Sequence, residues 1–438
     1  MCAIMFAMSK KGLSTNPYKG VRDFYPQQMA EQNYIFSVWK KIAELYGYEE
    51  YSASVLEPTE LYKAKSGEEI INEQTYSFKD RGDREVTLRP EMTPTVARLV
   101  AGKRRELGFP LRWYSIPNLF RYEREQRGRL REHWQLNVDC FGATGIEIEA
   151  EIIEIADAVM KGFGGKSSDY RIKISHSAFL NNFISKKVAD AELVSPLIKL
   201  IDRSSKIETD EYISRFKKIA PAWIGDPMEF VSISKVNESL AGLSEYRSIA
   251  DLAELLLARG ISVEISPLLT RGFDYYTGMI FEVYDTNPKN SRSLFGGGRY
   301  DNLLEIFGGE RVPSVGFGMG DVTIRNFLEE RNLFPGFKST TDIYIGVIDS
   351  ESLKAAYRFA KDLRSLGVRT SIDSSYRKGS DQKKSASKLA IPYFVLFGSD
   401  ERDGGKCKVS DMNDGTSTFY DSAAAIAVAL KKKKSRTL

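Results

Sequence analysis

Histidine and cysteine are scarce in this sequence. Its 438 residues include 2 histidines, His133 and His176, and 3 cysteines, Cys2, Cys140 and Cys407. The cysteines lie far apart and are odd in number, and no His, Cys or acidic partner stands at ligand spacing around His176. A disulfide framework or a Cys/His zinc site is therefore not expected, and the sequence predicts no metal site. His176 is expected to be a surface or hydrogen-bonded histidine.

Long apolar runs are also missing. No stretch approaches the roughly 18 apolar residues that a membrane span requires, so no membrane association is expected. The N-terminal stretch MCAIMFAM is apolar but short and has no basic segment before it, which argues against a secretory signal. The sequence therefore predicts a cytoplasmic protein. Mitochondrial targeting stays open as an alternative, because residues 1–18 contain no acid but include Lys10 and Lys11.

The chain has little excess charge of either sign. Its 63 Lys and Arg against 59 Asp and Glu leave a net charge of +4, so any contact with nucleic acid must come from local basic patches. With 42% hydrophobic and 28% charged residues the composition is that of an ordinary globular protein. The length is typical of about three domains.

The stretch 119–142, LFRYEREQRGRLREHWQLNVDCFG, reads as two strands joined by a basic loop. Period-two alternation places Gln135, Asn137 and Asp139 on one face of the second strand and apolar residues on the other. One face is therefore expected to pack in a core and the other to meet a polar ligand.

The first strand and the loop are rich in arginine. Alternation directs Arg121 and Glu123 to one side of the strand, where a guanidinium can stand over the same polar floor. The loop adds Arg124, Arg127, Arg129 and Arg131. Arginine meets phosphate oxygens in bidentate fashion, so this charge suggests a phosphate ligand. A solvated antiparallel pair with a charged tip is the alternative that the pattern alone leaves open.

Here a family resemblance enters. The run Phe120-Arg121-Tyr122-Glu123 resembles motif 2 of the class II aminoacyl-tRNA synthetases. The ending Gln135-Leu136-Asn137-Val138-Asp139 resembles the version found in histidyl-tRNA synthetases. The resemblance implies that Arg121 neutralises the α-phosphate of ATP, while Gln135 and Asp139 hold histidine.

A second site signature lies in residues 85–103, EVTLRPEMTPTVARLVAGK, which predict a strand and then a helix. Thr93 is expected as the helix N-cap and Pro94 as the first helical residue. Glu91 then occupies the corner between strand and helix, and the corner resembles the Leu-Arg-Pro-Glu-x-Thr sequence of the family. The resemblance implies that Glu91 and Thr93 hold the ammonium group of the substrate; as the alternative, both only cap the helix.

The most specific signature is LTRGFDYYTGMIFEVY at 269–284, followed by FGGGRYDNLLEIFG at 295–308. Both closely resemble segments peculiar to histidyl-tRNA synthetases. The resemblance implies that the catalytic Arg271 faces the α-phosphate opposite Arg121, and that Tyr275 and Tyr276 belong to the histidine site. Adjacent aromatics before an ordinary core strand are the alternative for this segment.

Residues 315–328, VGFGMGDVTIRNFL, resemble motif 3, a glycine-rich strand that enters a helix under the adenine. This sequence departs from the family pattern, because Thr323 stands where class II enzymes usually carry an arginine. Arg325 cannot replace it, since two residues turn a helix by about 200°. The ATP-binding residues that the resemblance implies are Arg121, Glu123, Arg129, Arg131, Gly318 and Gly320.

The predicted fold is α+β, with the antiparallel-sheet catalytic core of a class II synthetase, a helical insertion and a small α/β domain with a mixed sheet. The core is expected in 1–169 and 256–333, and the insertion in 170–255. Residues 338–438 alternate strand and helix and resemble an anticodon-binding domain. A basic, aromatic edge at Tyr376-Arg377-Lys378 and 382–384 suits tRNA.

These resemblances imply a homodimeric enzyme that joins L-histidine to tRNA(His). ATP is expected as a substrate, with Mg²⁺ accompanying its phosphates. A sister synthetase for another amino acid would share motif 2 and the C-terminal domain but should lack RGFDYY followed by GGGRYD. A non-catalytic regulatory paralogue would usually lack the C-terminal domain and the reactive arginines, both of which are present here.

Overall fold

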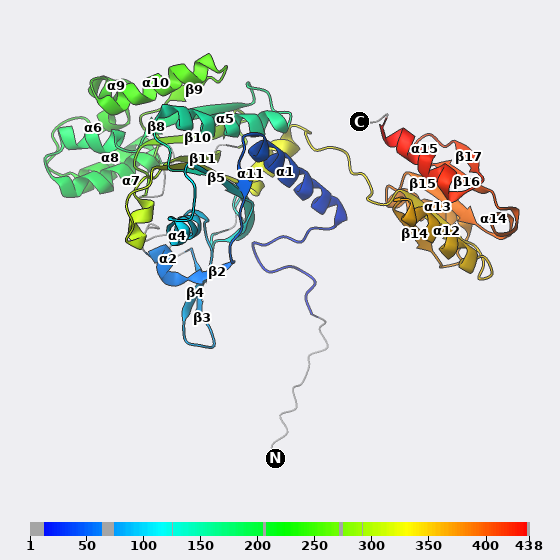
Figure 1. Ribbon diagram of the computed structural model, residues 1–438. Coiled ribbons are helices and arrows are strands. Elements are labelled where there is room, and N and C mark those ends of the chain that lie inside the picture. The colour runs from blue at the N-terminus through cyan, green and yellow to red at the C-terminus, as the bar shows by residue number, and fades with distance from the viewer. Residues whose placement is uncertain are drawn as a thin grey trace. The chain divides into compact units, whose positions relative to one another are not determined.

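The structure is a computed structural model that describes residues 13–63, 74–124, 126–204, 207–270, 275–290 and 292–435. The chain forms two compact units, Met1–Phe334 and Pro335–Leu438 (Figure 1). Within the described ranges, no helix combines the length and apolar character needed to cross a bilayer.

A 9-stranded sheet, counted over the described residues, organises the first unit. Its strands are β1 (Glu49–Glu50), β5 (Leu111–Ser115), β6 (Asn118–Phe120), β7 (Glu132–Phe141), β8 (Tyr170–His176), β9 (Val263–Ile265), β10 (Met279–Asp285), β11 (Ser293–Arg299) and β12 (Ser314–Gly320). Their order is β1-β5-β7-β12-β11-β10-β8-β9, and β6 pairs with the outer part of β7. Among the described strand pairs of this sheet, only β1–β5 and β8–β9 are parallel, so the prediction of an antiparallel core is confirmed.

Helices cover one face of this sheet. They are α1 (Pro26–Leu45), α5 (Ile146–Gly162) and α11 (Asp321–Glu330). Ile35, Trp39 and Ala43 recur at helical spacing on α1 and are buried against the core. From β7, Leu136 and Val138 enter the same core, as the alternation of the strand predicts.

The opposite face of the sheet is covered only in part. The helix α4 (Thr93–Lys103) and the 3₁₀ helix η4 (Leu303–Phe307) build a smaller core there, which includes Phe141, Tyr275 and Tyr300. A separate 3-stranded sheet, β2-β4-β3, adjoins α4 through α2 (Thr59–Lys63). Its strands are β2 (Leu56–Pro58), β3 (Tyr76–Lys79) and β4 (Glu85–Leu88). Figure 1 shows the β3–β4 hairpin extending from the body of the unit.

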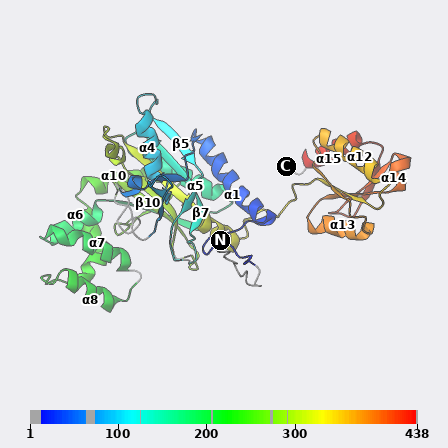
Figure 2. The same cartoon turned by 90° about the horizontal axis from the view of Figure 1, so that it is seen from below.

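The predicted insertion begins later than the sequence suggested. Residues 170–176 are β8, which pairs with β10 along its whole length and belongs to the central sheet. The helical part follows as α6 (Phe179–Lys187), η1 (Ala191–Leu193), α7 (Val194–Arg203), α8 (Thr209–Ile219), η3 (Pro227–Val231), α9 (Ile233–Leu240) and α10 (Ser244–Ala258). Figures 1 and 2 both show α6, α7 and α8 on the side of the unit away from α1. The buried hydrophobic residues of β8, Tyr170, Ile172 and Ile174, alternate as in a strand, a signal that the sequence contained.

His176 ends β8 and is hydrogen bonded. Its Nδ1 accepts the N–H of Ala178 at 3.1 Å, and its ring stacks on Phe179. Burial lowers the pKa of His176. The expectation of a satisfied histidine is confirmed.

The second unit has the predicted alternation of strands and helices. Its elements are β13 (Ile343–Val347), α12 (Leu353–Ser365), β14 (Thr370–Asp373), α13 (Gly379–Lys388), β15 (Tyr393–Phe397), α14 (Ser399–Gly404), β16 (Cys407–Asp411), β17 (Ser417–Tyr420) and α15 (Ala423–Ser435). The 5-stranded sheet over the described residues has the order β14-β13-β15-β16-β17. Its first three strands are parallel and the others antiparallel, so the sheet is mixed. The short helix α14 was not predicted.

Candidate active site

A cavity of about 420 Å³ lies over the polar face of β7. Its lining comprises Glu91, Thr93, Arg121, Gln135, Asn137, Asp139, Tyr275, Tyr276, Gly296, Tyr300, Gly316, Phe317 and Gly318. Residues from five separate stretches of the sequence therefore meet in one place.

The floor of the cavity is built by β7 and β12 together. Gln135, Asn137 and Asp139 point from β7, and Gly316 and Gly318 lie on the neighbouring strand opposite Asp139 and Asn137. A Cβ at Gly318 would come within 2.8 Å of the Gln135 side chain, and a Cβ at Gly316 would overlap the Asp139 carboxylate. These glycines leave the space that the polar side chains occupy.

Asp139 is buried at the bottom of the cavity, and the hydroxyl of Tyr300 donates a hydrogen bond to it. Burial raises the pKa of Asp139 to about 7, although the bond from Tyr300 acts in the opposite direction. Burial and the adjacent carboxylate also raise the pKa of Tyr300 well above its usual range. Asp139 thus titrates near neutral pH, where it can either accept or donate a hydrogen bond.

Tyr300 was not assigned to the site from the sequence. It lies just after β11, two residues beyond the glycine triplet Gly296–Gly298. Asn137, Gly296, Gly316 and Phe317 were also missed as lining residues. The alternation of β7 had placed Asn137 on the correct face, so that signal was available.

The wall beside the floor carries Glu91 and two tyrosines. Glu91 is 3% exposed, and the hydroxyl of Tyr275 donates to its carboxylate at 3.5 Å. The rings of Tyr275 and Tyr276 lie 4.8 Å apart between centroids. The prediction that Thr93 caps α4 is wrong: Met92 is the N-cap and Thr93 is the first helical residue. Pro94 fits this arrangement because N–H groups in the first turn have no helical acceptor.

Arg121 lies at the edge of the same cavity. Its Nε donates to the carbonyl of Pro90 at 2.9 Å, which fixes the guanidinium against the segment that carries Glu91. On β7, burial and the nearby Arg121 and Arg22 lower the pKa of His133 to about 3, so this imidazole is neutral. Arg271, the predicted partner of Arg121, lies outside the described residues.

The predicted ATP-binding residues of the loop after β6 take different directions. Glu123 forms an ion pair with Arg129, with 3.1 Å between Oε2 and Nη1. Arg131 instead donates to the Tyr18 hydroxyl at 3.1 Å and lies over the ring of Tyr122. The lining of the cavity includes none of Glu123, Arg129 and Arg131.

Motif 3 forms β12 and α11 as expected. Gly318 lines the cavity, whereas Gly320 is the N-cap of α11 and does not line it. The hydroxyl of Thr323 donates to the carbonyl of Leu294 at 2.6 Å. Arg325 points toward α1 instead of the cavity. Its guanidinium donates to Glu31 at 2.6 Å and to Gln32 at 3.0 Å.

Among the residues that the structure describes, no group of three or more His, Cys, Asp or Glu side chains gathers as metal ligands. The described side chains therefore do not fit a resident metal ion.

Known proteins are similar to this chain over nearly all of its length. A family model described as histidyl-tRNA synthetase matches residues 20–322, and one described as anticodon binding domain matches residues 342–432. The histidine–tRNA ligase of Leptospira biflexa is 42% identical over 442 residues, covering 97% of this chain and 100% of the relative. That of Haloarcula marismortui is 34% identical over 410 residues, covering 91% and 93%.

Solved structures give the same picture. The apo histidyl-tRNA synthetase of S. aureus has a TM-score of 0.74 at 25% identity and covers 96% of this chain and 100% of that chain. A chain from Bacillus halodurans described as an ATP phosphoribosyltransferase regulatory subunit/histidyl-tRNA synthetase has a TM-score of 0.69 at 22% identity, covering 88% and 98%. The second likeness concerns the fold alone.

Proposed function

This chain belongs to the histidyl-tRNA synthetase family and is an ATP-dependent histidine–tRNA ligase, and we propose that the cavity over β7 is where it activates histidine. The observation that carries the proposal is the meeting of Glu91, Gln135, Asp139 and Tyr276 in one cavity. These residues come from separate motifs and offer the polar groups that an amino acid with an imidazole side chain requires.

Histidine is held at both ends in this proposal. Glu91, Thr93 and Gln135 accept hydrogen bonds from the ammonium group. Asp139 and Tyr276 fix the imidazole and thereby select its tautomer, while Tyr275 supports Glu91. Tyr300 positions Asp139 through its hydrogen bond.

Activation needs no protein nucleophile. An oxygen of the histidine carboxylate attacks the α-phosphorus of ATP, a new P–O bond forms, and the bond to the β-phosphate breaks as pyrophosphate leaves. The carboxylate is already anionic, so the protein contributes alignment and neutralises charge at phosphorus. Arg121 performs this neutralisation at the edge of the cavity, with Arg271 assigned opposite it by sequence alone.

The histidyl group then passes to tRNA. A ribose hydroxyl of the terminal adenosine attacks the histidyl carbonyl, and AMP leaves. The second unit binds the anticodon region of the tRNA. Its exposed residues Tyr376, Lys378 and Lys383 lie on one loop and on the helix that follows it, and they are the groups assigned to this contact. Arg377 is held by Asp373 at 2.8 Å and shapes this loop.

Mg²⁺ enters with the triphosphate as part of the substrate in this proposal. It supplies charge neutralisation on the departing pyrophosphate.

We also propose a homodimer. Leu56 and Phe78 carry apolar side chains that are 46% and 49% exposed on the small sheet of β2, β3 and β4. Sedimentation equilibrium should give twice the chain mass, and a monomer at micromolar concentration would contradict this. A cytoplasmic location stays a prediction. Cell fractionation tests it, and recovery of the protein in mitochondria would support the alternative.

The deciding experiment for histidine activation is amino-acid-dependent exchange of labelled pyrophosphate into ATP. Exchange should be supported by histidine and not by proline, threonine or glycine. Equal exchange with threonine would overturn the amino-acid assignment, and no exchange with any amino acid would indicate a regulatory paralogue.

A further inference from the structure

Thr323 leaves the start of α11 without the positive charge that the resemblance to motif 3 leads one to expect. A second cavity, of about 390 Å³, opens beside this residue. Arg127, Lys289 and Arg292 line it together with Thr323. Three cations from two loops therefore surround the position where one arginine from α11 is missing.

The second cavity adjoins the histidine cavity along β11. Leu294 lines the second cavity and Gly296 lines the first. These two residues are two positions apart on β11, about 6–7 Å along the strand, and the pairing of β11 with β10 is irregular at Leu294. One extended ligand can therefore occupy both cavities.

Arg292 is held at this junction by its neighbours. It lies just before β11, and the hydrogen bond from Thr323 to Leu294 joins the beginning of that strand to α11. Its Nη2 donates to Oε1 of Gln126 in the loop after β6 at 2.6 Å. Burial and the guanidinium of Arg129 lower the pKa of Arg292, whereas the Glu123 carboxylate acts in the opposite direction. Two guanidinium groups thus face one carboxylate.

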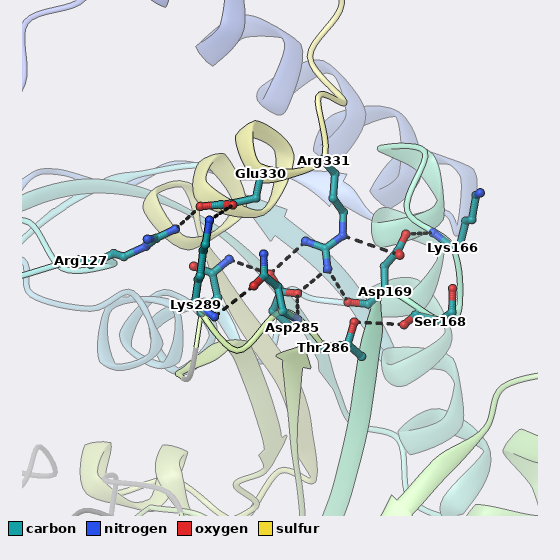
Figure 3. A network of polar contacts seen from close by, with 11 residues as sticks. Arg127, Lys166, Ser168, Asp169, Asp285, Thr286, Lys289, Glu330 and Arg331 are labelled. Atoms are coloured by element: carbon teal, nitrogen blue, oxygen red, sulfur yellow. Dashed lines mark hydrogen bonds and ion pairs between the residues drawn. The ribbon is translucent and has the colours of Figure 1, made fainter.

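The other two cations share a second carboxylate. Arg127 and Lys289 approach Glu330, at the end of α11, to 2.6 Å and 3.7 Å (Figure 3). Figure 3 also shows how the turn after β10 is fixed: Arg331 pairs with Asp285 at 2.5 Å. The Asp285 side chain is fully buried, so this turn has a rigid support.

The charges of this group do not balance. Among the described residues named above, Arg127, Arg129, Lys289 and Arg292 face only Glu123 and Glu330. Guanidinium groups that share a carboxylate repel each other, and an anion between them removes that repulsion. A polyphosphate fits this excess of positive charge.

We propose that Arg292 binds the β- and γ-phosphates of ATP and replaces the arginine that α11 lacks at Thr323. The inference rests on the proposed function, because it places the α-phosphate beside Arg121 in the first cavity. The triphosphate then runs along β11 into the second cavity. Phosphates of the tRNA acceptor end are the alternative ligand of Arg292. The tests below distinguish binding of ATP from binding of tRNA.

The test measures nucleotide binding and catalysis separately. For Arg292→Ala, equilibrium binding of Mg²⁺-ATP without histidine should weaken about tenfold to a hundredfold, the range for a lost hydrogen bond to a charged group. Binding of AMP should change less than twofold. In histidine-dependent exchange without tRNA, KM for ATP should rise while KM for histidine stays within twofold.

Three further variants make the result specific. Arg292→Lys should retain part of the ATP affinity, and Thr323→Arg added to Arg292→Ala should restore it, because the new guanidinium enters the same cavity. Arg215→Ala removes an exposed arginine that pairs with Glu211 on α8 and should leave ATP affinity unchanged. Thermal unfolding curves establish that each variant is folded.

Wild-type ATP affinity in Arg292→Ala would overturn the proposal. An equal loss of ATP and AMP binding would also overturn it. A rise in KM for tRNA with unchanged pyrophosphate exchange would overturn it as well and would assign Arg292 to the acceptor end of tRNA. The binding arms need no histidine, so they remain decisive even if histidine fails to support exchange and the proposed function itself is wrong.

Discussion

The hydroxyl of Tyr300 donates a hydrogen bond to the carboxylate of Asp139, which links the segment after β11 to the middle of β7. The two residues are 161 positions apart in the chain. Burial raises the pKa of Asp139 to about 7 at this place. Asp139 is the residue assigned to the imidazole, and its ionised form lowers the stability of the folded protein. Such perturbed groups are common at functional sites.

Asp139→Asn should stabilise the protein above neutral pH and impair histidine activation. The Asp139 pKa is about 7 when folded and near 3.9 when unfolded, so the folded state binds more protons between these values. Wild-type stability therefore falls as pH rises from about 4 to 7. The variant lacks this loss and should be more stable at pH 8 by on the order of 2–4 kcal/mol.

Thermal unfolding of both proteins from pH 4 to 8 checks this prediction. The gain in Tm for Asp139→Asn should grow with pH and level off above about pH 7. A gain independent of pH would show that Asp139 is ionised throughout this range.

Gly318→Ala should weaken histidine binding with little loss of stability. The added Cβ would lie 2.8–2.9 Å from the end of the Gln135 side chain, which can rotate away but then leaves its position in the cavity. KM for histidine in pyrophosphate exchange should rise several-fold. Gly102→Ala is the matched control, because no described atom lies within 4 Å of a Cβ there. Equal KM values for the two variants would contradict the placement of Gln135.

Arg271→Ala should slow adenylate formation far more than it weakens histidine binding. The charge at this position matters most when negative charge develops at phosphorus, and losing one such donor costs about 10²–10³ in rate. Single-turnover adenylation with saturating histidine measures the step. A variant of normal rate would show that Arg121 acts with a different partner.

Thr323→Ala should leave the affinity for ATP nearly unchanged, because no charge is lost. It does remove the hydrogen bond to Leu294 and should lower stability by about 1 kcal/mol. Isothermal titration with ATP and a denaturant curve measure the two effects. ATP affinity reduced tenfold would mean that the threonine hydroxyl itself holds the nucleotide.

Truncation before Pro335 should separate the two activities. The second unit has its own core around Ile345 and Val395, and the first unit contains the cavity over β7. The shortened protein should exchange pyrophosphate but charge tRNA poorly, because distant phosphate and stacking contacts are lost. Light scattering must first show that it has the same oligomeric state as the full chain. Parallel loss of both activities in a folded protein would contradict this division.

Much of the site could be predicted from local patterns. The alternation of β7 showed which face carries Gln135 and Asp139, since side-chain direction in a strand depends only on position. The glycines of β12 also followed from the sequence, and the register opposite Asp139 explains why they are needed. In the second unit the predicted alternation of strands and helices agreed with the structure, apart from α14, because each element has its own apolar period.

Other features depended on contacts between distant segments. The central sheet includes β8 because β10, more than a hundred residues later, pairs with it. Arg129 and Arg131 have the same chemistry, but Glu123 pairs with the first and Tyr18 and Tyr122 hold the second, so neither lines the cavity over β7. Tyr300 reaches Asp139, and Arg292 reaches the cavity beside Thr323, only after β11 has packed next to β12. The sequence by itself determined which residue types each element presents, whereas the pairing of strands determined which of them meet, because pairing is a non-local choice that local periodicity does not contain.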